Sequence, residues 1–203
     1  MTKQIIDEKR ELILKTACEI LARQGFAKTT LDDIANAIGM KKSSLYYYYT
    51  NKDALLDDVM KREENQFRLR VEEALSKSES VIDKIINYEK AKFEYVQETI
   101  KLHDISTTVF HEVKSKLFEH IKRIHSNEIE RIRKLLDEGV KNKEIKKCDT
   151  KKVADLILTL SEALRHREFY FASFTVSTKI DFTNAVDEMI FAIKLIFDGL
   201  STN

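Results

Sequence analysis

Apolar residues recur at helical spacing along almost the whole chain. Near its start, Ile13, Ala17 and Leu21 lie at positions i, i+4 and i+8, which share one face of an amphipathic helix. Gly25 follows, and glycine readily adopts the left-handed conformation that ends a helix. The pattern therefore predicts a first helix that ends near Gln24.

Two shorter helical segments are expected next. Thr30 can cap a helix together with Asp33, three residues later, as in a capping box. Apolar residues then repeat at helical spacing over residues 31–38, and Gly39 provides a stop. After a short turn, the stretch KKSSLYYYY (41–49) is predicted to be helical.

A long helix is predicted from about residue 53, with Thr50 or Asn51 available as its N-cap. Short capped helices around a glycine-containing turn are typical of a helix-turn-helix that reads DNA. We therefore expect residues 1–52 to form a small domain and residues 53–203 to form a larger one, joined by the long helix. Further amphipathic helices are expected at 80–101, 103–120, 121–141, 150–172 and 183–198.

The composition favours an all-α fold and narrows the function. The 203 residues include no proline and four glycines, so most of the residues needed for hairpins and phosphate-binding loops are missing. A net charge of +1 gives no global reason to expect nucleic acid, anionic lipid or an acidic substrate. Any such partner must be met by a local patch.

Two cysteines, Cys18 and Cys148, stand far apart without a CxxC spacing, which argues against a disulfide framework or a zinc site. The chain starts without a secretory leader and has no run of about 18 apolar residues. We therefore expect a cytoplasmic protein that does not enter a membrane.

One predicted helix carries the candidate chemistry. With Leu45 turned to the core, Lys42, Ser43, Tyr46 and Tyr47 fall on the opposite face. Serine hydroxyls bond base edges, lysine approaches guanine or phosphate, and tyrosine offers a phenol and a ring. This face suits docking into the major groove of DNA.

A basic patch accompanies this face. Between Gly39 and Lys52 the chain has three lysines and no acid. Lys52 stands near the start of the long helix, where free N–H groups and the helix dipole attract phosphate. The alternative is that the four consecutive tyrosines fill a joint between domains and the lysines are solvated. The residues alone leave both interpretations open.

The stretch from Ile13 to Met60 resembles the N-terminal DNA-binding domain of the TetR family of bacterial transcriptional regulators. The resemblance is carried by Gly25, Phe26, Thr29, Thr30, Asp33, Ile34, Ala35, Gly39, Met40, Leu45, Tyr46, Asn51, Lys52, Ala54, Leu55 and Leu56. Together with the outward face and the patch, it implies contacts to double-stranded operator DNA from Thr30, Lys41, Lys42, Ser43, Ser44, Tyr46, Tyr47, Tyr48 and Lys52.

Four residues depart from the family pattern. Ser43 stands where the family often has glycine, Tyr49 where it usually has phenylalanine, Ile38 where alanine is common, and Thr50 where proline is frequent. A buried tyrosine hydroxyl needs a partner or an exit to water. We therefore predict that the Tyr49 ring packs inward, with its hydroxyl at the DNA-facing edge.

For the rest of the chain the resemblance implies helices around an effector cavity and two last helices that pair in a homodimer. Without it, the apolar runs 153–164 and 185–197 are equally readable as intrachain core. It also implies a small-molecule inducer, and base-rich stretches at 114–134 and 141–152 would favour an anionic one, unless they are solvated surface. Candidate pocket residues are Phe67, Phe93, Phe110, Phe118, Arg165, His166 and Tyr170.

The predicted function is a ligand-responsive, homodimeric repressor, with activation as an open alternative. The rival is an all-α enzyme or a helical interaction module. The sequence has no Gly-rich loop and no GxSxG elbow, and only one Glu-x-x-His spacing, Glu162 to His166. The spacing of the five histidines does not suggest a metal site. We expect no catalytic residue, no metal and no cofactor.

Overall fold

The computed structural model describes residues 2–103, 118–174 and 180–201. Within these ranges the chain forms eight helices and no strand, which confirms the all-α prediction. Contacts divide the chain into two compact units. Among the described residues, the first unit holds 2–68 and 100–103, and the second holds 69–99, 118–174 and 180–201.

The first unit begins with α1 (Thr2–Lys28). The backbone leaves the helical conformation at Gly25 (φ 79°, ψ 163°), so the regular helix ends where the sequence predicts and a short turn follows. The buried Thr29 hydroxyl donates to the Gly25 carbonyl at 2.8 Å. Ile13, Ala17 and Leu21 are all buried, as expected from their shared face.

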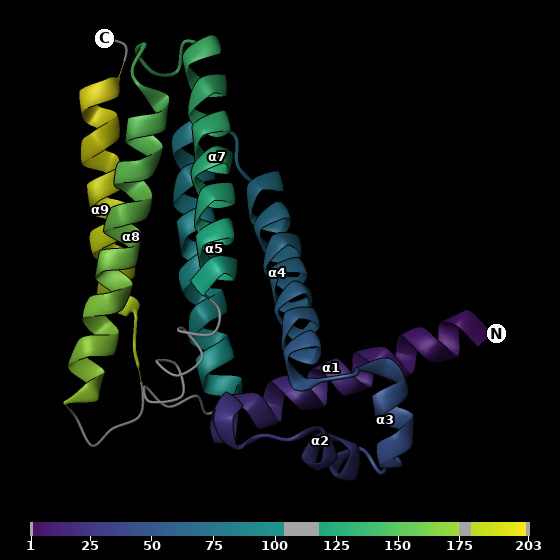
Figure 1. Ribbon diagram of the computed structural model, residues 1–203. Helices are drawn as coiled ribbons and strands as arrows, with labels where there is room; N and C mark the ends of the chain where they lie inside the picture. The colour runs from purple at the N-terminus through teal and green to yellow at the C-terminus, as the bar shows by residue number, and fades with distance from the viewer. Residues whose placement is uncertain (1, 104–117, 175–179, 202–203) are drawn as a thin grey trace. The chain divides into compact units, whose positions relative to one another are not determined.

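Two short helices and the start of a long one complete the unit: α2 (Leu31–Ala37), α3 (Lys42–Tyr48) and α4 (Lys52–Ser76). Thr30 and Asp33 form the predicted capping box, and Gly39 has the left-handed φ of 65° that turns the chain. Asn51 caps α4 through Oδ1, which accepts from the Ala54 N–H at 2.8 Å. In Figure 1, α2, the turn and α3 form the helix-turn-helix.

The second unit is a bundle of long helices: α5 (Val81–His103), α7 (Phe118–Lys141), α8 (Thr150–Ser173) and α9 (Thr183–Leu200). Figure 1 shows α8 running antiparallel to α7 and α9. Gly139 allows a close approach, since a Cβ there would lie 2.9 Å from the Val81 side chain. The backbone N–H of Lys146 donates to the Leu200 carbonyl at 2.7 Å, which ties the α7–α8 connection to the end of α9.

The helix predicted at 103–120 falls largely on residues 104–117, which lie outside the described residues. The prediction is wrong for residues 118–120, which begin α7 and do not end the helix predicted before it. The apolar side chains of α7 recur at helical spacing from further upstream than the predicted start at 121. α1 extends to Lys28, four residues beyond its predicted end, although its regular part ends at Gly25. The other helix ends agree with the predictions to within two residues.

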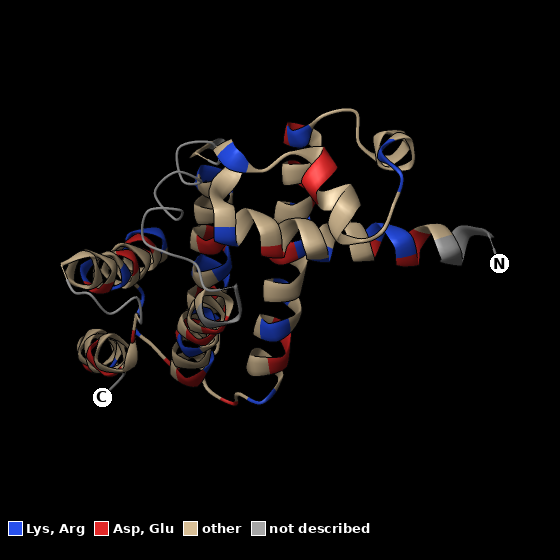
Figure 2. Cartoon of the chain, turned by 90° about the horizontal axis from the view of Figure 1, so that it is seen from below, with Lys and Arg blue, Asp and Glu red and all other residues tan. Residues whose placement is uncertain are grey.

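Charged residues of both signs are interspersed along the described helices (Figure 2). None of the described helices combines the length and the apolar character needed to span a bilayer. In the same ranges, no group of three His, Cys, Asp or Glu side chains is placed to hold a metal ion. Both cysteines are free thiols.

Candidate functional site

The outer face of α3 is exposed as its sequence predicts. Leu45 is fully buried, whereas Tyr46 is 42% and Tyr47 85% exposed. Lys42 and Ser43 are exposed beside them. This face of α3 therefore presents two exposed tyrosine rings beside a lysine and a serine.

The other predicted contacts lie around this face in different environments. Lys41 is the N-cap residue of α3, where its side chain makes no capping hydrogen bond. It is exposed, as is Ser44. Tyr48 is half-buried and meets the Tyr47 ring edge to face, with 5.7 Å between ring centroids. α3 therefore offers a continuous surface of hydroxyls, ammonium groups and aromatic rings.

Thr30 and Lys42 already have polar partners among the side chains of α2. The Thr30 hydroxyl donates to Asp33 Oδ2 at 2.6 Å and accepts from the Asp33 N–H at 3.1 Å. Lys42 Nζ lies 2.6 Å from Asp32 Oδ2 in an exposed ion pair, which raises the pKa of Lys42 through a hydrogen bond to that carboxylate. Exposed pairs of this kind are weak and exchange easily, so Lys42 is available to a phosphate.

Lys52 has a structural role that the sequence did not reveal. Its ammonium donates to the carbonyls of Phe26 (2.5 Å) and Thr29 (2.8 Å) and lies 4.2 Å from the centre of the Phe26 ring. These carbonyls stand at the end of α1 and before α2, where backbone acceptors lack helical partners. Lys52 thus ties the start of α4 to the connection between α1 and α2.

We expect Lys52→Ala to destabilise the protein as well as to weaken DNA binding. Loss of two charge-assisted hydrogen bonds should lower the free energy of unfolding by about 1–3 kcal/mol, measured by urea denaturation at fixed protein concentration. DNA affinity should fall for all sequences alike, with a salt slope smaller by about one. Lys41→Ala is the matched control, since it should leave stability unchanged. Equal stability of both variants would contradict the role given to Lys52.

The Tyr49 ring is buried, as predicted, with 4% of the residue exposed. Its hydroxyl donates to Asp58 Oδ2 at 3.2 Å and accepts from Arg10 Nε at 3.4 Å, while Arg10 and Asp58 form an ion pair. Burial raises the pKa of Tyr49. The partners of the hydroxyl belong to α1 and α4, not to the exposed surface of α3, so the predicted place of the hydroxyl at the DNA-facing edge is wrong. This departure from the family pattern instead links α1, α4 and the end of α3.

A second group of polar residues is buried in the other unit. It consists of Glu89 and Lys92 of α5, Glu128 of α7, and Ser161 and Arg165 of α8, which we call the buried polar cluster. The first four residues of the cluster are less than 8% exposed. Glu128 Oε1 accepts from the Tyr88 hydroxyl at 2.8 Å and lies 3.0 Å from Lys92 Nζ.

The two carboxyl groups of the buried polar cluster differ in their environments. Burial alone would raise the pKa of Glu128, but the charges of Lys92 and Arg165 outweigh it and lower that pKa. Burial raises the pKa of Glu89, whose Oε2 accepts from the Ser161 hydroxyl at 2.6 Å. Glu128 is therefore the ionised partner of the two cations.

The residues predicted to line a ligand cavity differ widely in their exposure to solvent. Phe93 is buried, Phe67 is half-buried and His166 is exposed. Phe118 and Tyr170 are 63% and 62% exposed. Phe110 lies outside the described residues. Arg165 is half-buried and belongs to the buried polar cluster, so Phe93 and Arg165 are the two that lie in the interior of the bundle.

Sequence patterns did not identify four members of the buried polar cluster as site residues, namely Glu89, Lys92, Glu128 and Ser161. A signal was present, because Ile85, Glu89 and Lys92 stand at i, i+4 and i+7, and such positions share one helix face. Charged residues on an apolar stripe indicate buried polar groups, which are usually functional or paired.

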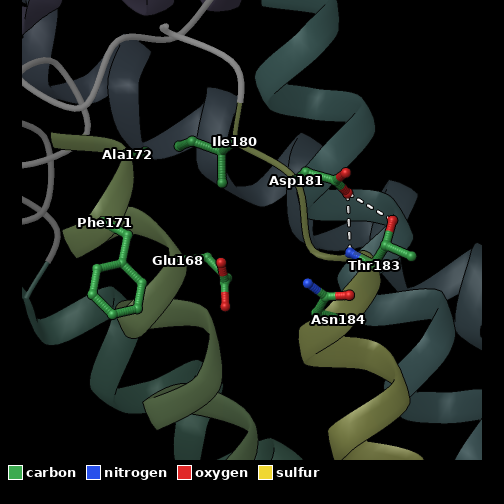
Figure 3. Close-up of a pocket in the computed structure, with 7 residues that line it drawn as sticks. All are labelled: Glu168, Phe171, Ala172, Ile180, Asp181, Thr183 and Asn184. Atoms are coloured by element: carbon green, nitrogen blue, oxygen red, sulfur yellow. Dashed lines mark hydrogen bonds between the residues drawn. The ribbon is translucent and has the colours of Figure 1, made fainter. Parts of the chain in front are cut away.

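A pocket of about 280 Å³ opens between the end of α8 and the start of α9. Its lining, drawn in Figure 3, combines carboxylates with apolar side chains and consists of Glu168, Phe171, Ala172, Ile180, Asp181, Thr183 and Asn184. Asp181 accepts from the Thr183 N–H and hydroxyl, and Glu168 accepts from Arg167 at 2.8 Å. One oxygen of each carboxylate in the pocket therefore already accepts hydrogen bonds from neighbouring groups.

The last two helices have two apolar faces each. Ile157 and Leu158 of α8 and Met189 and Ile193 of α9 are buried within the bundle. Elsewhere on these helices, large apolar side chains are more than half exposed, namely Leu156, Tyr170 and Phe171 of α8, Phe174 at its C-cap, and Phe191 and Leu195 of α9. Clusters of exposed large apolar residues mark interaction surfaces.

Comparison with known proteins assigns the first unit. Residues 13–59 match the sequence model of the family described as bacterial regulatory proteins, tetR family. The HTH-type transcriptional regulator YhgD of Bacillus subtilis is 25% identical over 161 residues, which cover 77% of this chain and 82% of that protein. IcaR of Staphylococcus epidermidis, the negative transcriptional regulator of the biofilm operon icaADBC, is 28% identical over 58% of this chain and 63% of its own length.

The fold of the whole chain is also found in solved structures. A transcriptional regulator from Saccharomonospora viridis, crystallised in complex with choline, superposes with a TM-score of 0.69 over 97% of this chain and 100% of its own. Its sequence is 15% identical, so the likeness concerns the fold alone. The helical architecture of both units is thus that of known regulators.

Proposed function

The chain belongs to the tetR family of bacterial regulatory proteins through its N-terminal residues, and we propose that it is a repressor released from a palindromic operator by a small-molecule inducer. Its proposed site of action is the cytoplasm, where bacterial DNA lies. Residues 1–52 form the proposed DNA-binding domain, and residues 53–203 bind the effector and dimerise.

The exposed face of α3 is the observation that carries this proposal. Tyr46, Tyr47, Ser43 and Lys42 stand on the second helix of a helix-turn-helix, the element that such proteins place in the major groove. The proposed contacts to bases come from these four residues. Thr30, Lys41, Ser44, Tyr48 and Lys52 are proposed to contact the DNA backbone around them.

Homodimerisation through α8 and α9 is the second part of the proposal. Leu156, Ala163 and Tyr170 are exposed at seven-residue spacing on α8, and Phe191 and Leu195 are exposed one turn apart on α9. A stripe of this kind suits packing against a second copy with helices nearly parallel or antiparallel. A dimer doubles the few base pairs that one short helix can read.

Release by a ligand follows from the course of α4. This helix begins beside α3 and continues into the second unit at residue 69. An inducer that binds better to one position of α4 shifts the population toward that position. The two α3 helices of the dimer then no longer fit both half-sites together, and operator affinity falls.

Selection from a randomised DNA pool tests the proposed function. The purified protein is incubated with the pool at about 50 and 200 mM salt, and the retained DNA is sequenced. A palindromic motif whose retention weakens at the higher salt is the expected result. A folded dimer that enriches no sequence would instead favour the rival class, a helical enzyme or interaction module.

For the selected operator, Tyr46→Ala and Tyr47→Ala are each expected to cost about 1–3 kcal/mol of binding free energy. Both side chains are exposed, so thermal stability and dimerisation should be unchanged. Fluorescence anisotropy with labelled operator measures the loss, and calorimetry checks the fold. Wild-type affinity in both variants would remove α3 from the proposed interface.

A further inference from the structure

The buried polar cluster of the second unit contains more polar atoms than it pairs. Glu89 Oε1, Lys92 Nζ and Arg165 Nε are all buried and have no hydrogen-bond partner. Lys92 does lie 3.0 Å from Glu128 as an ion pair, but without hydrogen-bonding geometry. Native proteins pair nearly all buried polar atoms, and a group of exceptions calls for an explanation.

These three atoms come from one site. The charges of Lys92 and Arg165 both act on Glu89 and on Glu128, so all four groups lie within short electrostatic range of one another. The atoms belong to α5 and α8, with Glu128 contributed by α7. A ligand placed among these helices could engage all three unpaired atoms.

The unpaired atoms indicate the sign of that ligand. Two of the three atoms without a hydrogen bond, Lys92 Nζ and Arg165 Nε, are donors on cationic side chains. The third, Glu89 Oε1, belongs to a carboxyl group whose second oxygen already accepts from Ser161. Buried charges in proteins are paired, so an anion with oxygen acceptors would complete the cluster.

Buried aromatic side chains stand near Lys92 and Arg165 on the same two helices. Phe93 follows Lys92 on α5, and Phe169 lies one turn beyond Arg165 on α8. Both rings meet Phe182 edge to face, with centroids 5.7 and 5.8 Å apart. A ligand whose charged group lies in the cluster would therefore have an apolar environment for the rest of its structure, as ligand cavities usually provide.

We propose that the buried polar cluster binds the carboxylate of an otherwise apolar organic acid, with Lys92 Nζ and Arg165 Nε as its hydrogen-bond donors. This inference rests on the proposed function, because such an acid would be the effector. Charge-assisted hydrogen bonds from two cations would supply most of the discrimination in favour of an anion.

The test uses the full-length protein and two acids, octanoate and 4-phenylbutyrate, each compared with its primary amide. The amides keep the shape but lose the charge. We expect at least one acid to raise the melting temperature and to bind in calorimetry, with its amide about tenfold weaker or more. Equal binding of acid and amide, or no binding of either acid, would overturn the inference.

Variants assign the binding to the cluster. Lys92→Met and Arg165→Gln should each weaken the acid about tenfold or more, whereas Glu89→Gln, which leaves both cations in place, should retain it. Lys90→Met, a half-buried lysine on α5 outside the cluster, is the matched control. If Lys92→Met does not fold, Arg165→Gln and Glu89→Gln still decide. Unchanged acid binding in Arg165→Gln refutes the assignment.

Binding of the selected operator is measured on the same preparations without any acid. If the protein binds the operator but neither acid, this inference is wrong, and the DNA-binding part of the proposed function is retained. Acid binding through Lys92 and Arg165 without any operator supports the site and contradicts the proposed function. The two failures are therefore distinguishable.

Discussion

A double variant, Phe191→Glu with Leu195→Glu, is expected to be monomeric and to bind its operator at least about 100-fold more weakly than the wild type. The second α3 helix of a dimer binds at high effective concentration once the first is docked, which contributes a factor of about 10²–10⁴. Carboxylates on an apolar contact surface would repel each other and lose hydration. Sedimentation velocity and an operator titration measure both effects.

The matched control is Leu69→Glu on α4. Leu69 is 49% exposed, against 64% for Phe191 and 55% for Leu195, but it lies away from α8 and α9 in the sequence. This variant should remain dimeric and bind the operator normally. If the variant Phe191→Glu with Leu195→Glu is still a dimer, the exposed face of α9 is excluded as the dimer interface.

The largest loss of stability is expected for Glu128→Leu. Removing this carboxylate leaves Lys92 without its ion pair and the Tyr88 hydroxyl without its acceptor, both in the interior. Breaking a buried ion pair by removing one partner typically costs about 3–5 kcal/mol. The free energy of unfolding from urea denaturation should fall by this amount, with protein concentration held constant because a dimer is expected.

The double variant Glu128→Leu, Lys92→Met separates charge from packing. Replacing both members of a buried pair by apolar residues is often neutral, so much of the lost stability should return. Glu130→Leu, which breaks an exposed pair with Arg133 on the same helix, should leave stability nearly unchanged. A double variant as unstable as Glu128→Leu would show that the cost arises from packing and not from the unpaired ammonium.

Local signals in the sequence were sufficient for most of the first unit. Gly25, Thr30 with Asp33, and Gly39 act on neighbouring backbone, so their effects are readable without the fold. The burial of Leu45 and the exposure of Tyr47 follow from helical spacing alone. Residues in this class were predicted correctly.

Contacts between distant residues could not be read in the same way. The Lys52 ammonium donates hydrogen bonds to carbonyls 23 and 26 residues earlier, and the Tyr49 hydroxyl accepts one from Arg10, 39 residues earlier. Both side chains have long reach, so spacing does not limit their partners. The buried polar cluster joins three helices, and a charged residue on an apolar stripe indicates burial without saying which opposite charge meets it.

In the protein without DNA, the Asp32 carboxylate occupies the place beside the Lys42 ammonium that a phosphate group would take. An aspartate 2.6 Å from the ammonium replaces part of the ion atmosphere that a solitary lysine would collect from solution. In the proposed complex, in which Lys42 contacts DNA, Asp32 is left beside a polyanion and repels it. The proposal therefore predicts that the net gain from Lys42 is smaller than its charge suggests. It also predicts that weak binding to random DNA is suppressed more than binding to a site where base contacts by α3 compensate.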